Sequence, residues 1–275
     1  MSRAIHARHS QDPILDDHWA IELLTPENRE RVLASADAQS LQPTPGFDAS
    51  PIFALGVASL RYAEDEVERC VARGIGQYLI LGAGFDTFAL RRTDLTGRLR
   101  VYEVDHPDVQ TLKRARIEAA ERETASLPRF VPVDFETTSL TNELARSDFD
   151  RSQPAILSWL NTIPYLTEET TVSTLSELHA LLAPGSRIVV NYAAKVPLSP
   201  DQQAFLSRLA AVISGAGEPQ RSRWVPEEFE AMLTRLGFTL VEHASEVDLT
   251  ARYFEGRADG LKPGVPGRII TADRN

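Results

Sequence analysis

The chain alternates short runs of apolar residues with longer stretches in which apolar and polar positions repeat at helical spacing. Short apolar or β-branched runs are typical of strands that are buried in a sheet. Seven runs have this character: YLIL (78–81), RVYEV (100–104), PRFVPV (128–133), AILSWL (155–160), RIVVNY (187–192), FTLVEH (238–243) and GRIITA (267–272). Helical stretches at 107–123, 168–182 and 226–236 fall between them. This strand, helix, strand repeat predicts an α/β fold with a parallel, doubly wound sheet of about seven strands.

Other segments flank or interrupt this alternation. Residues 1–50 are polar and punctuated by proline, with one short amphipathic piece around Trp19, and we expect them to form an N-terminal helical arm. Residues 52–71 carry apolar positions at intervals of three, four and seven, which predicts a helix with one buried face. Residues 195–225 contain a helix-like stretch that no strand follows, so we expect a cap insertion over the edge of the sheet. The remaining domain would then span residues 51–275.

Composition and charge exclude several classes of partner. The 275 residues carry a formal net charge of −10, which would repel a polyphosphate backbone, so we expect no nucleic-acid partner. No segment is apolar enough to cross a bilayer, and the start MSRAIHARHSQD lacks the apolar run of a signal peptide, so we expect a cytoplasmic protein with no membrane partner. The single cysteine, Cys70, has no His or Cys at ligand spacing, and we expect it to pack in the core, with no metal site. These patterns predict no particular oligomeric state.

The segment after the first predicted strand carries a candidate ligand loop. In an open α/β sheet, ligands bind beyond the carboxyl ends of the strands. Gly82 and Gly84 flank Ala83 at this position, and glycine allows both a tight turn and the close approach of a ligand to the main chain. Thr87 stands where a dinucleotide-binding loop has its third glycine, which argues against a nicotinamide cofactor. A plain tight turn is the alternative interpretation.

Acidic residues follow the second and third predicted strands. Glu103 and Asp105 end the second strand, and Asp105 lies 23 residues beyond the first loop glycine, where a carboxylate can accept hydrogen bonds from both ribose hydroxyls of a nucleoside. Asp134 and Phe135 end the third strand, where a carboxylate and an aromatic face can hold an adenine. The alternatives are a solvated strand end for Asp105 and, for Asp134, the cap of a helix that begins near Ser139.

Five segments together resemble a known family. They are LGAGFDTFALRR (81–92), VYEVDHP (101–107), VPVDFE (131–136), SWLNTIPYLTEE (158–169) and LLAPGSRIVVNY (181–192). In this order and spacing they resemble the leucine carboxyl methyltransferase-like family of S-adenosylmethionine-dependent O-methyltransferases, which includes bacterial polyketide O-methyltransferases. The resemblance runs from about residue 50 to the C-terminus. It implies a Rossmann-like, seven-stranded class I methyltransferase sheet whose last strand is antiparallel, with S-adenosyl-L-methionine as cofactor and S-adenosyl-L-homocysteine as product.

The resemblance also implies a set of cofactor-binding residues. The glycine loop would pack against the cofactor, Asp105 would hold the ribose, and His106 would help to seat the adenosine. Arg61 begins Arg61-Tyr62-Ala63-Glu64-Asp65, which matches a family pattern whose arginine pairs with the methionine carboxylate, and a guanidinium can grip a carboxylate with two hydrogen bonds. An ordinary surface charge is the alternative for Arg61. The full set is Arg61, Gly82, Ala83, Gly84, Glu103, Asp105, His106, Asp134, Phe135, Trp159 and Leu160.

The chain departs from the family after the fourth predicted strand. Leu160-Asn161 stands where family members commonly carry Glu-Gly. A glutamate contact to the methionine amino group is therefore missing, and we expect a backbone carbonyl of Trp159 or Leu160 to replace it.

The expected acceptor is an oxygen of a small organic acid, and a carboxylate fits best. A carboxylate is already ionised at neutral pH and needs no general base, and no His-Asp pair stands out to supply one. His106 is the candidate base if the acceptor is instead a phenol or another hydroxyl of a natural product. Tyr62, Asn161, Tyr165 and Tyr192 are candidates to line the substrate pocket, each with a core or rim position as the alternative.

Two other classes of function remain open. One is an NAD-dependent oxidoreductase, which Thr87 and the lack of a recognisable Tyr-x-x-x-Lys motif disfavour. The other is a module that binds S-adenosylmethionine without catalysis.

Overall fold

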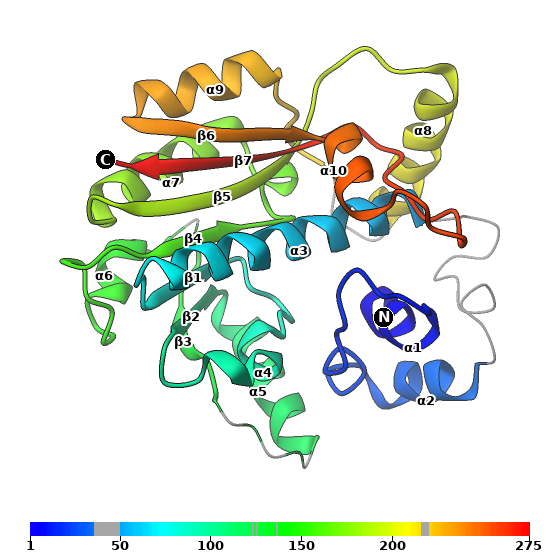
Figure 1. Ribbon diagram of the computed structural model, residues 1–275, viewed down its shortest axis with the longest axis horizontal. Helices are drawn as coiled ribbons and strands as arrows, with labels where there is room; N and C mark the ends of the chain where they lie inside the picture. The colour runs from blue at the N-terminus through cyan, green and yellow to red at the C-terminus, as the bar shows by residue number, and fades with distance from the viewer. Residues whose placement is uncertain (36–49, 121, 123, 125, 136, 216–219) are drawn as a thin grey trace.

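A computed structural model describes residues 1–35, 50–120, 122, 124, 126–135, 137–215 and 220–275 of the chain (Figure 1). Its helices are α1 (Ser2–His9), α2 (Pro26–Ala34), α3 (Ser50–Ala72), α4 (Phe88–Arg91), α5 (Pro107–Ala119), α6 (Leu140–Leu144), α7 (Glu168–Leu181), α8 (Pro200–Gly215), α9 (Pro226–Arg235) and α10 (Glu246–Tyr253), with short 3-10 helices η2 (Thr93–Leu95) and η3 (Ile163–Tyr165). Its strands are β1 (Gln77–Leu81), β2 (Arg100–Asp105), β3 (Arg129–Pro132), β4 (Ile156–Trp159), β5 (Ser186–Ala193), β6 (Phe238–Ser245) and β7 (Gly267–Arg274). Among the described residues, no helix has the length and apolar character needed to span a bilayer.

The strands form one sheet in the order β3-β2-β1-β4-β5-β7-β6. The pairs among β1 to β5 are parallel, whereas β7 runs antiparallel to both β5 and β6. The predicted seven strands and the antiparallel last strand are both confirmed. The direction in which successive strands are added reverses between β1 and β4, and such a reversal opens a crevice at the carboxyl ends of the two central strands. We call the space at the ends of β1 and β4 the crevice.

Alternate side chains of each central strand pack on opposite faces of the sheet, as the pleat requires. Leu79 and Leu81 of β1 belong to a core shared with α6, α7 and α9. Tyr78 and Ile80 belong to a second core shared with α3, α4 and α10, and that core also contains Cys70. The sheet is therefore the middle of three layers (Figure 1). The prediction that Cys70 packs in the core is confirmed.

The predicted elements agree with the structure apart from their ends. Each predicted strand is present, with ends displaced by one or two residues. The helix predicted over 107–123 is described to Ala119, and residues 121 and 123 lie outside the described residues. The pattern missed α4, α6 and α10, which have 4, 5 and 8 residues and are too short to show a helical period.

Two segments lie beyond the carboxyl ends of the parallel strands (Figure 1). One is α8, within the predicted cap insertion, whose Leu206 and Leu209 pack against Leu55 at the start of α3 and against Val265. The other is the N-terminal segment with α1 and α2. The amphipathic piece around Trp19 forms consecutive turns, and it packs on α4 and α5. Both segments therefore lie on the side of the sheet where the crevice opens.

A buried carboxylate ties the N-terminal segment to the glycine loop. Asp17 accepts hydrogen bonds from the hydroxyl of Thr87 at 2.7 Å, from the guanidinium of Arg3 at 2.7 Å and from the backbone N–H of Ala20 at 3.0 Å. The Arg3 guanidinium also donates to the carbonyl of Phe85 in the loop. Asp17 is 1% exposed, so these donors replace the water that it loses on folding.

We predict that Asp17→Asn lowers the free energy of unfolding by about 1 to 3 kcal/mol, because the neutral amide loses charge-assisted hydrogen bonds. Urea denaturation measures the change. The matched control is Asp16→Asn, which alters an exposed neighbour and should leave the stability unchanged. Equal stability of the two variants would contradict the structural role of Asp17.

Candidate functional site

The two loop glycines have different reasons to lack a side chain. Gly82 and Gly84 both adopt the left-handed backbone region, with φ of 60° and 49°. A Cβ on Gly82 would collide with the hydroxyl of Thr162 in the turn after β4, so the packing of the protein itself excludes one. A Cβ on Gly84 would meet no described atom within 4 Å. The space beside Gly84 is therefore open to a ligand that approaches the main chain.

Asp105 lies directly beside this loop. Its carboxylate accepts hydrogen bonds from the backbone N–H of Gly84 and from that of His106, each at 2.6 Å. An ionised carboxylate has about four acceptor sites, so both oxygens can still accept from the hydroxyls of a ligand. The structure thus brings the glycine loop and Asp105 together at the crevice, as the sequence predicts.

Glu103 lies deeper than the sequence predicts. Its carboxylate pairs with the ammonium of Lys113 on α5, and each side chain is 1% exposed. Burial raises the pKa of Glu103 to about 7, although the Lys113 charge acts in the opposite direction. The pair lies between β2 and α5, so its visible role is to hold α5 against the sheet beneath the crevice.

His106 lies at the surface, where it begins α5. Its Nδ1 accepts a hydrogen bond from the backbone N–H of Asp108 at 3.3 Å, and the side chain is about half exposed. The imidazole therefore caps the helix. It also adjoins the crevice, because its own backbone N–H donates to Asp105.

The segment after β3 contacts the end of β4. The Asp134 carboxylate accepts a hydrogen bond from the hydroxyl of Thr137 at 2.7 Å. The alternative that Asp134 caps the following helix is wrong, because the side chain of Ser139 caps α6. Phe135 stacks on the indole of Trp159, with ring centroids 6.5 Å apart. The structure therefore brings these residues of β3 and β4 to one end of the sheet.

The turn after β4 explains the departure from the Glu-Gly pattern. Asn161 has a φ of 57° and is the only described residue other than glycine in the left-handed region. Asparagine tolerates this conformation better than most residues, so it can stand at the glycine position of the Glu-Gly pattern. Leu160 packs in the core under α3, and its carbonyl accepts from the hydroxyl of Thr162 at 3.0 Å.

Arg61 bonds to another partner than its predicted cofactor role requires. Its side chain is 45% exposed, and its Nε donates to Asp65 at 2.9 Å. The other oxygen of Asp65 accepts from Tyr253 of α10 at 2.7 Å. Within the described part of the chain, Arg61 thus bonds to Asp65 on the α10 side of α3 and makes no hydrogen bond to the glycine loop.

The structure separates the four candidates for the substrate pocket. Tyr62 and Tyr192 are 0% and 2% exposed, and their hydroxyls bond to Glu242 at 2.7 Å and to His243 at 2.8 Å. Burial raises the pKa of both tyrosines, so neither is readily ionised. Asn161 and Tyr165 are exposed at the carboxyl end of β4. Of the four candidates, these two are the ones whose side chains are exposed.

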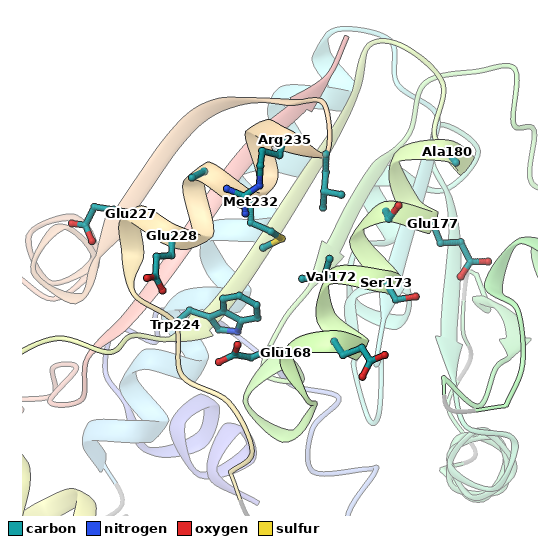
Figure 2. A pocket seen from close by; sticks show the side chains of 14 residues that line it. Glu168, Val172, Ser173, Glu177, Ala180, Trp224, Glu227, Glu228, Met232 and Arg235 are labelled. Atoms are coloured by element: carbon teal, nitrogen blue, oxygen red, sulfur yellow. The ribbon is translucent and has the colours of Figure 1, made fainter.

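A groove of about 1230 Å³ lies elsewhere, between α7 and α9. Figure 2 shows side chains of the two helices on opposite sides of this groove, with Trp224 near one end. None of the predicted cofactor-binding residues lines it. The groove and the crevice are therefore separate features.

Three residues near the crevice escaped the sequence analysis. Thr162 contacts Gly82, and Asn191 of β5 and Ser59 of α3 bond to each other. The sequence could have pointed to Asn191, because a polar residue within the apolar strand run IVVNY is unusual. The sequence gives no such indication for Ser59 and Thr162, because serine and threonine are common on surfaces and in turns.

Comparison with known proteins places the fold. The leucine carboxyl methyltransferase family model matches residues 1–179. YktD of Bacillus subtilis (strain 168), provisionally described as an S-adenosyl-L-methionine-dependent methyltransferase, is 28% identical over 94% of this chain and 90% of its own. A provisionally assigned methyltransferase from Thermobifida fusca YX has a TM-score of 0.57 at 19% identity, covering 99% of this chain and 94% of its own. The magnesium protoporphyrin IX methyltransferase ChlM of Synechocystis PCC 6803, solved with bound S-adenosylhomocysteine, has a TM-score of 0.51 at 15% identity, covering 80% and 84%.

The sheet order, the antiparallel last strand and these relatives define a class I, S-adenosylmethionine-dependent methyltransferase with a Rossmann-like fold. Within that class, the chain belongs to the leucine carboxyl methyltransferase family. The match begins at residue 1, whereas the sequence motifs indicated a resemblance only from about residue 50. The N-terminal segment that contacts the glycine loop is thus part of the family pattern.

We predict that Glu103→Gln lowers the free energy of unfolding at pH 8 by about 3 to 5 kcal/mol, because it leaves the buried Lys113 charge without its partner. The double variant Glu103→Gln, Lys113→Met should lose less, since no buried charge remains. Urea denaturation compares the two. An equal or larger loss in the double variant would show that packing, rather than charge, decides the effect.

Proposed function

We propose that this protein transfers the methyl group of S-adenosylmethionine to an oxygen of a small organic acid, at a carboxylate. The observation that carries the proposal is the crevice, where the open space beside Gly84 adjoins the Asp105 carboxylate. A main chain without a side chain, next to an acidic residue, suits an adenosyl group. The ligand can approach the main chain closely, and the carboxylate can accept hydrogen bonds from the ribose hydroxyls. Membership of a carboxyl methyltransferase family supports the choice of acceptor.

The residues of the crevice fit this cofactor. In the proposal, Gly82, Ala83 and Gly84 pack against it, and Asp105 accepts from its ribose. Asp134 and Phe135 meet the adenine, for which a carboxylate and an aromatic face are suitable partners. Bound S-adenosylmethionine supplies an electrophilic methyl group on a sulfonium. The tasks of the protein are then to orient the acceptor and to exclude water.

The surroundings of the crevice favour an acceptor that needs no base. The tyrosine hydroxyls of Tyr62 and Tyr192 are buried and bonded within the core. The Nδ1 of His106 already accepts from the start of α5. A carboxylate is ionised without help at neutral pH, so this arrangement is sufficient for it.

We propose a matching division of the chain. Residues 51–275 form the methyltransferase domain, with residues 195–225 as a cap insertion, and residues 1–50 form an arm, of which the described part, residues 1–35, contacts the glycine loop. The contacts of Asp17 and Arg3 with the loop support a role of the arm in shielding the crevice from water. Residues 36–49 and 216–219 lie outside the described residues.

The cofactor assignment predicts that calorimetry detects binding of S-adenosylhomocysteine and no binding of NAD. Asp105→Ala should weaken this binding by roughly 1.5 to 3 kcal/mol, because it removes charge-assisted hydrogen bonds. Asp108→Ala is the matched control, since Asp108 is exposed at the start of the same helix. Binding of NAD instead, or an unchanged affinity in Asp105→Ala, would overturn the assignment of the site.

The acceptor assignment predicts an alkali-labile product and a flat pH dependence. A carboxylate with a pKa of about 4 is ionised throughout, so single-turnover methyl transfer should vary little between about pH 6 and 8. A phenol with a pKa of about 10 would react faster as the pH rises. Small organic acids supply the candidate substrates, and mild alkali should release methanol from the product. An alkali-stable ether would reject the carboxylate and leave the methyltransferase function intact.

A further inference from the structure

A chain of hydrogen bonds fixes the turn after β4. The backbone N–H of Asn161 donates to the side-chain oxygen of Asn191 at 2.6 Å. The side-chain nitrogen of Asn191 donates to the Ser59 hydroxyl and to the side-chain oxygen of Asn161, both at 2.9 Å. The Ser59 hydroxyl donates in turn to the carbonyl of Leu55 at 2.8 Å. The chain links β5, the turn after β4 and α3.

The directions of these bonds follow from chemistry alone. A backbone N–H can only donate, so the oxygen of Asn191 must face Asn161. The nitrogen of Asn191 then faces the Asn161 side chain, which must present its oxygen in return. The side-chain nitrogen of Asn161 is left pointing away from the network with two N–H donors. Among the described residues, none accepts a hydrogen bond from that nitrogen.

Burial shows where these donors point. Asn191 is 6% exposed and Ser59 is buried completely, whereas Asn161 is exposed. Asn161 lies at the carboxyl end of β4, next to Thr162, which contacts Gly82 of the glycine loop. A rigid buried base therefore holds an exposed amide at the crevice. An N–H of this amide that points outward can donate to an oxygen of a carboxylate.

We propose that the side-chain amide of Asn161 binds the carboxylate of the methionyl group of the cofactor, with Asn191 as the residue that positions it. This inference rests on the proposed function and assigns the group that receives the amino-acid end of S-adenosylmethionine. It gives Asn161 the role that the sequence pattern assigned to Arg61, whose guanidinium bonds to Asp65 on the α10 side of α3.

The test compares two adenosyl thioethers, one with the amino-acid end and one without it. S-adenosylhomocysteine carries the amino-acid carboxylate, whereas 5′-methylthioadenosine lacks it. Asn161→Asp should weaken S-adenosylhomocysteine about tenfold to a hundredfold, because a carboxylate replaces a donor to a charged group. It should leave 5′-methylthioadenosine unchanged. Asn161→Gly keeps the left-handed backbone and should show a smaller loss with the same selectivity.

The positioning role of Asn191 is tested by a separate variant, Asn191→Asp. Asn191→Asp still accepts from the backbone N–H of Asn161 but cannot donate to its side chain. Asn161 must then turn its nitrogen inward and present its oxygen to the ligand. The variant should therefore weaken S-adenosylhomocysteine and leave 5′-methylthioadenosine binding unchanged, which also shows that it is folded. Because the new carboxylate is buried, its unfolding midpoint should lie below that of Asn142→Asp, an exposed control for the added charge.

The outcomes separate this inference from the proposed function. If the wild-type protein binds neither ligand, the proposed function fails. If it binds both and Asn161→Asp weakens them equally or not at all, only the inference fails. A selective loss of S-adenosylhomocysteine in Arg61→Ala, without one in Asn161→Asp, would return the carboxylate to Arg61. Unchanged cofactor binding with a raised KM for an organic acid would instead assign the amide to the acceptor carboxylate.

Discussion

The contact between the turn after β1 and the turn after β4 is the constraint on which the rest of the site depends. Gly82 lies so close to the Thr162 hydroxyl that a Cβ would collide with it. The two turns meet because β1 and β4 are neighbours at the point where the sheet order reverses. Their contact holds Gly84 on one side of the crevice and Asn161 on the other. The left-handed backbone of both residues follows from the same tight geometry.

Three carboxylates, of which Asp17 and Glu103 are buried, stabilise the walls around this contact. Asp17 joins the N-terminal segment to the loop, Glu103 joins α5 to β2 through Lys113, and Asp105 accepts from the loop itself. A buried carboxylate without partners would cost several kcal/mol, so each one enforces the position of its donors. Asp17 and Asp105 hold the glycine loop in this way from two sides, so it is preorganised before any ligand arrives.

The comparison of Arg61 with Ser59 shows why a matched motif did not identify the geometry. The two residues lie two positions apart on α3, and successive helical residues turn by about 100° around the axis. Ser59 is therefore buried against β5 and bonds to Asn191, whereas Arg61 is 45% exposed and bonds to Asp65. A sequence pattern gives the residue type but not the direction of the helix face, which the packing of α3 on the sheet decides.

The sequence by itself determined the seven strands, the main helices and the glycine loop, and the resemblance of its motifs to a known family implied the class of cofactor. These features depend on contiguous residues, because strand and helix periods and the need for glycine in a tight turn are local properties. Only the tertiary structure decided that Tyr62 and Tyr192 are buried, that Glu103 pairs with Lys113, and that Asn191 orients Asn161. The bonds of Asn191 join residues that are 30 and 132 positions apart in the chain, and no local pattern records such a pairing. Their geometry exists only after the strands have paired and α3 has packed on the sheet.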